Sequence, residues 1–103
     1  MTVHVAERRR SARLPAAYPA VIVDSQGRFI AKGRTTNISH EGAFILASAK
    51  ALVPEQVVAI EITVPSLGGT PKTRVVVYTC RVARRQGIGQ LLGVGVEFLR
   101  KLR

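Results

Sequence analysis

Apolar residues recur at every second position along much of this chain, and this repeat constrains the fold more than any other feature of the sequence. In residues 57–64, all four even-numbered positions are Val or Ile. A repeat of two places alternate side chains on opposite faces of a β-strand, so one face of this segment is suited to a core. Residues 65–71 then hold two prolines and two glycines, which predict a turn. We therefore expect a chain built from short, half-buried strands.

Five other segments have a strand-forming composition and are bounded by turn residues. Together with residues 57–64, they give six expected strands: residues 18–23, 29–37, 42–46, 57–64, 74–84 and 92–98. Residues 24–27 are typical of a turn and join the first two strands as a hairpin. The last five residues are too few for a stable isolated helix and would form at most a short C-terminal helical turn. Short strands joined by short turns predict an all-β fold, a small antiparallel β-barrel of about six strands.

The N-terminal residues differ from the rest of the chain. Residues 1–13 are polar and charged with no sustained apolar repeat, so we expect a mobile basic arm there and a barrel domain over residues 14–103. A chain of 103 residues is long enough for a single domain with one core. No run approaches the ~18 apolar residues that span a bilayer, and the N-terminus lacks a signal pattern. We expect a cytoplasmic location and no membrane insertion.

The charge of the chain is strongly positive and is carried mainly by arginine. The formal net charge is +10, and 12 of the 16 cationic residues are Arg. Guanidinium groups bind phosphate oxygens in a fork and stack on aromatic planes, which favours an anionic partner such as a nucleotide. A solvated cationic surface that keeps a small protein soluble would have the same composition. Charge alone leaves both interpretations open.

Two polar motifs follow one another in the first half of the chain. The first is Arg9-x-x-x-Arg13, with Arg8 and Arg10 beside it. Planar cations close together suit a ligand that carries phosphates and base edges. A solvated tail is the ordinary alternative for such a segment.

The second motif is the hexapeptide Asn37-Ile38-Ser39-His40-Glu41-Gly42. In an extended backbone, the side chains of Asn37 and Ser39 emerge from the same face, where an amide and a hydroxyl can bind a base edge or a phosphate. Gly42 would allow a positive φ or would remove a Cβ that blocks the ligand. A hairpin turn made of good turn residues is the ordinary alternative.

The order and spacing of the two motifs resemble the PilZ domain family, in which R-x-x-x-R is followed at some distance by D/N-x-S-x-x-G. Residues 93–98, Gly-Val-Gly-Val-Glu-Phe, also resemble the last barrel strand of PilZ domains, so the resemblance runs from about Glu7 to Phe98. It implies a non-enzymatic receptor for cyclic di-GMP. The ligand-binding residues that it implies are Arg8, Arg9, Arg13, Asn37, Ser39 and Gly42.

The resemblance also implies how such a receptor works. The arm would fold over the nucleotide, and the signal would pass in trans to a downstream partner protein that the sequence does not identify. In this family the outputs are typically bacterial motility and biofilm or exopolysaccharide control. An arginine at the position of Arg8 accompanies the binding of two stacked ligands in PilZ domains, which implies two cyclic di-GMP molecules per chain and no other cofactor.

Two rival interpretations use the same charge. A small basic barrel could bind single-stranded nucleic acid, but such proteins stack bases on aromatic side chains, and this chain has three Phe, two Tyr and no Trp. Nucleic acid is therefore not the expected partner. A PilZ-like barrel that serves as a protein adaptor without a ligand is the other alternative.

Catalytic and metal-binding residues are not expected. Ser39, His40 and Glu41 are residue types of a hydrolytic triad, but adjacent side chains cannot converge in that geometry. His4 and His40 lack partners at metal-ligand spacing. Cys80, the single cysteine, is expected to be a small buried hydrophobe.

Overall fold

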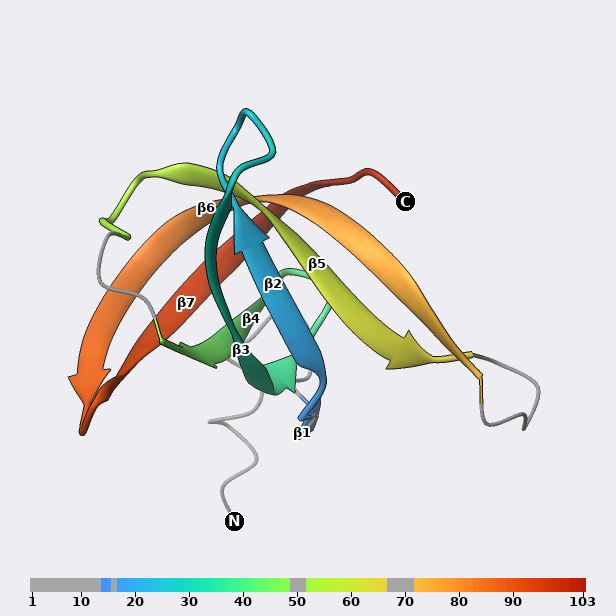
Figure 1. Ribbon diagram of the computed structural model, residues 1–103, viewed down its shortest axis with the longest axis horizontal. Helices are drawn as coiled ribbons and strands as arrows, with labels where there is room; N and C mark the ends of the chain where they lie inside the picture. Colours follow the sequence, from blue (N-terminus) through green and yellow to red (C-terminus); the bar gives the residue numbers. More distant parts are fainter. Residues whose placement is uncertain (1–13, 16, 49–51, 67–71) are drawn as a thin grey trace, which may run out of the picture.

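The computed structural model describes residues 14–15, 17–48, 52–66 and 72–103. These residues form seven strands and no helix, and so contain no segment of the kind that crosses a membrane as a helix (Figure 1). The strands are β1 (Leu14–Pro15), β2 (Pro19–Val23), β3 (Phe29–Ile38), β4 (Gly42–Ala47), β5 (Val57–Pro65), β6 (Thr73–Ile88) and β7 (Leu91–Lys101). The basic arm predicted at residues 1–13 lies outside the described residues.

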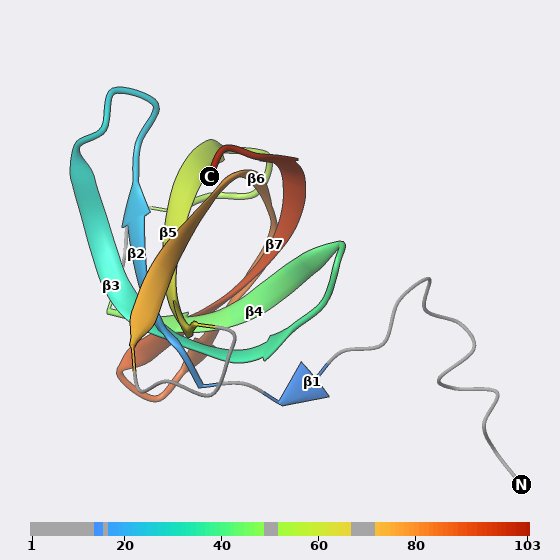
Figure 2. The same cartoon turned by 90° about the vertical axis from the view of Figure 1, so that its right-hand side faces the viewer.

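Six of the strands close into an antiparallel barrel. Their neighbour order is β3, β2, β5, β6, β7 and β4, and pairing between β3 and β4 completes the ring, which is seen nearly end-on in Figure 2. The seventh strand, β1, pairs with the end of β3. A closed ring is a stable solution for short strands because each backbone edge finds a partner. The prediction of a small antiparallel barrel of about six strands is confirmed.

The core occupies the inside of the ring, as the two-residue repeat predicts. On β5 the side chains of Val58, Ile60 and Ile62 are all at most 1% exposed. Each such side chain contributes roughly 1.5–3 kcal/mol when it is fully buried. Cys80 is also fully buried, as expected. The one polar residue buried with them in the described part of the chain is Thr35, whose hydroxyl accepts a 2.9 Å hydrogen bond from the Tyr18 backbone N–H.

Strands β6 and β7 form a hairpin that is longer than the sequence indicated. β6 continues to Ile88, past the expected end near Arg84, and pairs there with Leu91 of β7. At the other end, Arg100 and Lys101 pair with residues of β6, so residues 99–101 are strand. The helical turn considered for residues 99–103 does not form, because β6 offers these residues backbone partners that an isolated turn would lack.

Candidate ligand-binding site

A β-bulge in β3 determines which way the second motif faces. Thr35 lies opposite Ile45 and Asn37 lies opposite Phe44, so Thr36 is an extra residue with no residue of β4 directly opposite it. Thr35 points into the core, and regular alternation would turn Asn37 inward as well. The bulge shifts the alternation by one residue. Ile38 therefore packs against the core, and Asn37 lies on the outer face of the barrel.

The rest of the hexapeptide makes the tight connection from β3 to β4. The Ser39 N–H donates to the Gly42 carbonyl at 2.9 Å, and the Ser39 hydroxyl accepts from the Glu41 N–H at 3.1 Å. The Phe98 N–H donates to the Glu41 carbonyl at 2.8 Å, which ties the turn to β7. The motif is thus a hairpin turn, the ordinary alternative given for it. Its contact with a ligand stays a prediction.

Gly42 has a structural role that the sequence did not indicate. The positive-φ glycines of the described chain are Gly27 and Gly89, so the positive-φ explanation for Gly42 is wrong. A Cβ on Gly42 would lie 2.0 Å from the carbonyl oxygen of Val96. The glycine is required because β4 and β7 approach closely at this point. Whether the missing Cβ also makes room for a ligand stays a prediction.

The described chain begins beside the second motif. In the antiparallel pairing of β1 with β3, Leu14 lies opposite Ile38 and Pro15 opposite Asn37. The arginines of the first motif, Arg8, Arg9 and Arg13, lie outside the described residues. Leu14, the residue that follows Arg13 in the sequence, thus lies at the strand end that carries Asn37.

A row of residues runs across the outer face from Asn37. Phe44 lies opposite Asn37, Gly95 of β7 lies opposite Phe44, and Arg84 of β6 lies opposite Gly95. The Arg84 guanidinium carbon is 5.9 Å from the centroid of the Phe44 ring, within cation–π range. Asn37, Phe44 and Arg84 thus share one face of the barrel. Sequence reasoning identified only Asn37 among them.

The glycines of β7 explain why these side chains lie against the sheet. A Cβ on Gly95 would be 3.1 Å from Cγ of Arg84, and a Cβ on Gly93 would be 2.5 Å from Cζ of Phe44. In the structure, the space above them is filled by the two side chains.

Acidic partners divide the arginines of β6 into two kinds. Arg81 forms ion pairs at 2.8 Å with Glu55 and with Glu97, and the hydrogen bond that it donates to Glu97 is the main reason that the pKa of Arg81 is raised. Arg84 is exposed, and the described residues contain no carboxylate that pairs with it. Arg84 is therefore available to an anionic ligand, whereas Arg81 is already neutralised.

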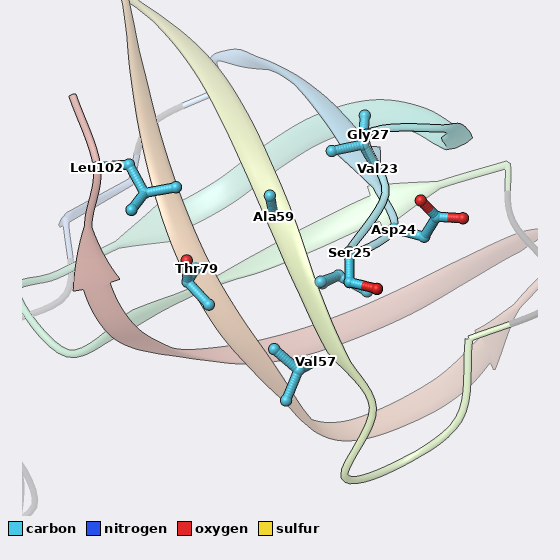
Figure 3. A pocket seen from close by; sticks show the side chains of 9 residues that line it. Val23, Asp24, Ser25, Gly27, Val57, Ala59, Thr79 and Leu102 are labelled. Atoms are coloured by element: carbon cyan, nitrogen blue, oxygen red, sulfur yellow. The ribbon is translucent and has the colours of Figure 1, made fainter.

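A shallow cavity of about 330 Å³ lies elsewhere on the barrel (Figure 3). Its lining residues are Val23, Asp24, Ser25, Gly27, Val57, Val58, Ala59, Thr79 and Leu102. The Asp24 carboxylate accepts hydrogen bonds from the N–H groups of Arg28 and Gln26, and these bonds, led by that from Arg28, lower its pKa. No residue of the candidate site lines this cavity, so it does not belong to the site.

The described residues contain neither a metal-binding cluster nor a reactive cysteine. Among them, no three His, Cys, Asp or Glu side chains are grouped closely enough to hold a metal ion. Burial raises the pKa of the Cys80 thiol to about 12, so the thiol is protonated at neutral pH and does not act as a nucleophile.

Comparisons with known proteins agree with this architecture. The family model of the PilZ domain matches residues 7–103. Among solved structures, the chain is similar to the PilZ domain with c-di-GMP of YcgR from Escherichia coli, with a TM-score of 0.62 and 19% sequence identity. The match covers 89% of this chain and 78% of that one. No curated protein matches the chain.

Proposed function

Because the chain belongs to the PilZ domain family, we propose that it is a receptor for cyclic di-GMP and not an enzyme. The observation that supports the proposal is that the described chain begins beside the second motif, at one end of β3. The described chain enters there through Leu14, directly after Arg13, and Asn37 lies opposite Pro15. The similar fold of the YcgR domain, which is described with c-di-GMP, supports the same ligand.

The chemistry of the ligand suits arginine. Cyclic di-GMP carries two phosphodiesters and two guanines, whose O6 and N7 atoms accept hydrogen bonds from a guanidinium fork. We assign Arg8, Arg9 and Arg13 to these groups. Arg13 is covalently joined to Leu14, so its Cα is about 3.8 Å from that of Leu14. A side chain attached there can reach a ligand that touches Asn37.

The second motif supplies neutral hydrogen-bonding groups in this proposal. The Asn37 amide lies on the outer face, and the Ser39 hydroxyl lies in the adjoining turn. Neither group repels a phosphate, as a carboxylate would. With the arm on one side and the barrel face on the other, the ligand would be clamped between two parts of the same chain.

The arm is the part that changes on binding in this proposal. Ordering a segment carries an entropic cost that charge-assisted contacts must exceed, and the surface thus created would be read by a partner protein in trans. The family outputs, bacterial motility and biofilm or exopolysaccharide control, are the processes that we propose for this chain. From Arg8, we propose that each chain binds two stacked ligands.

Isothermal titration calorimetry with cyclic di-GMP tests the receptor proposal. Arg13→Ala and Asn37→Ala should each weaken binding; for Arg13 the loss should be at least tenfold, because a charge-assisted hydrogen bond contributes roughly 1.5–3 kcal/mol. Arg74→Ala is the control and should bind normally. It removes an exposed arginine near the start of β6, where β6 pairs with Val64 of β5.

Two outcomes would contradict the proposal. Titration of the unaltered chain without heat of binding would exclude cyclic di-GMP as the ligand and leave the adaptor interpretation. Tighter binding of short single-stranded DNA or RNA in the same buffer would favour the nucleic-acid interpretation instead.

A further inference from the structure

We propose that Arg84 is an additional ligand-binding residue, whose guanidinium stacks on a guanine of the nucleotide held at Asn37. This inference rests on the proposed receptor function and extends its site from the two motifs to β6. It is carried by described residues alone: the row of side chains on the outer face, the glycines beneath them and the unpaired charge of Arg84.

The register brings Arg84 close to the second motif although the two lie far apart in sequence. Asn37 and Phe44 are directly opposite each other, which places their Cα atoms about 4.5–5.5 Å apart. The Arg84 guanidinium reaches back over Gly95 to within 5.9 Å of the Phe44 ring centroid. A base that touches the Asn37 amide therefore has this guanidinium as a near neighbour.

The side chain is held in a conformation suited to stacking. The aliphatic part of Arg84 lies across the backbone of Gly95, where any larger residue would place a Cβ 3.1 Å from its Cγ. Phe44 lies in the same way across Gly93 and supports the guanidinium from one side. Because Arg84 is exposed, the guanidinium is open to solvent on the side away from Phe44. Part of the entropy of ordering this side chain is thus lost before the ligand arrives.

The chemistry of this surface favours guanine over adenine. A guanidinium plane stacks on either purine, so the preference comes from a neighbouring guanine: its O6 and N7 can accept from the N–H groups at the edge of the plane, whereas adenine presents an amino donor in place of O6. Arg84 has no acidic partner among the described residues, so ligand binding requires no ion pair to be broken. Arg81, three residues earlier on the same strand, would first have to leave Glu55 and Glu97.

Calorimetry on the unaltered 103-residue chain and three variants tests this inference, with cyclic di-GMP and cyclic di-AMP as probes. Arg84→Ala should weaken cyclic di-GMP binding at least tenfold and reduce the preference over cyclic di-AMP. Arg84→Lys keeps the charge and loses the plane and the fork, so it should recover little of the affinity. Arg74→Ala removes the same charge from the far end of β6 and should stay within twofold of the unaltered chain. Circular dichroism on each sample verifies that it is folded.

Each contrary result has a distinct meaning. If Arg84→Ala and Arg74→Ala bind cyclic di-GMP equally well, Arg84 does not contact the ligand, and the receptor proposal is unaffected. If Arg84→Lys binds as tightly as the unaltered chain, charge alone is responsible and stacking is excluded. If the unaltered chain binds no cyclic di-GMP, both proposals are overturned.

Discussion

At Gly42, the absence of a side chain sets the distance between two strands. A Cβ there would lie 2.0 Å from the Val96 carbonyl oxygen, so either β4 or β7 would have to move. We expect Gly42→Ala to lower the free energy of unfolding by roughly 1–3 kcal/mol, the usual range for overpacking. Thermal melting followed by circular dichroism measures this loss.

Gly87→Ala is the matched control for Gly42→Ala. Gly87 is also a strand glycine, but nothing lies within 4 Å of the position that its Cβ would occupy, and its φ is not positive. This variant should melt at the temperature of the unaltered chain or slightly above it. Equal melting temperatures for the two variants would show that the strand spacing at Gly42 adapts easily.

Cys80 should make the barrel less stable as the pH rises into the alkaline range. Burial raises the pKa of its thiol from the ordinary 9.0 to about 12. The folded chain therefore keeps the thiol proton where the unfolded chain has lost it. The contribution of the neutral thiol to the free energy of unfolding is fully present below pH 9.0. It falls as the pH rises and is lost at about pH 12.

Urea unfolding at several alkaline pH values measures this effect. The free energy of unfolding should fall by up to about 1.4 kcal/mol per pH unit above pH 9 through this group. Cys80→Ala should be less stable at neutral pH because of the cavity, yet it should show a flatter decline. Parallel curves for the two proteins would contradict the assignment.

At the scale of the element, the turn between β3 and β4 has a double role. The Ser39 hydroxyl accepts the Glu41 N–H and is also a proposed ligand contact. Ser39→Ala should therefore lower stability modestly, by about 0.5–1.5 kcal/mol, the net contribution of one hydrogen bond. Affinity for cyclic di-GMP at 25 °C, where the chain stays folded, should fall as well. A loss of stability with unchanged affinity would leave Ser39 with the structural role alone.

Regular strands were predictable from the sequence because the chain itself encodes their repeat. Residues 57–64 alternate without a break, and β5 occupies Val57–Pro65. The bulge at Thr36 was not predictable, because it depends on how β3 pairs with β4, and no residue type marks it. The end of β7 was missed for the same reason, since residues 99–101 become strand only beside β6.

The candidate site was predictable only in part. Asn37 and Ser39 were proposed from their spacing and their resemblance to a family motif, and their contact with a ligand stays a prediction. Arg84 and Phe44 are 40 residues apart in sequence and meet only across a strand that contributes glycines. That contact requires the register of three strands, which neither composition nor local periodicity contains.

At the scale of the whole molecule, the arm would determine how many ligands each chain binds. A third guanidinium at Arg8 adds charge for four phosphates and a further fork for a second pair of guanines. We expect two cyclic di-GMP molecules per chain at saturation and a ratio closer to one for Arg8→Leu, measured by calorimetry. Affinity should fall as salt is added. Saturation of the unaltered chain at one ligand would exclude the stacked pair and leave the receptor proposal intact.

The closed ring also has a consequence for how the chain reaches its native state. β2 pairs with β5, and β4 pairs with β7, so the ring joins segments that are distant in sequence. Topologies of this kind fold in milliseconds to seconds because long loops must close first. During synthesis, β4 has only β3 as a partner until β7 is made. The nascent chain therefore presents an open strand edge, and its protection from pairing with other chains depends on the arrival of β7.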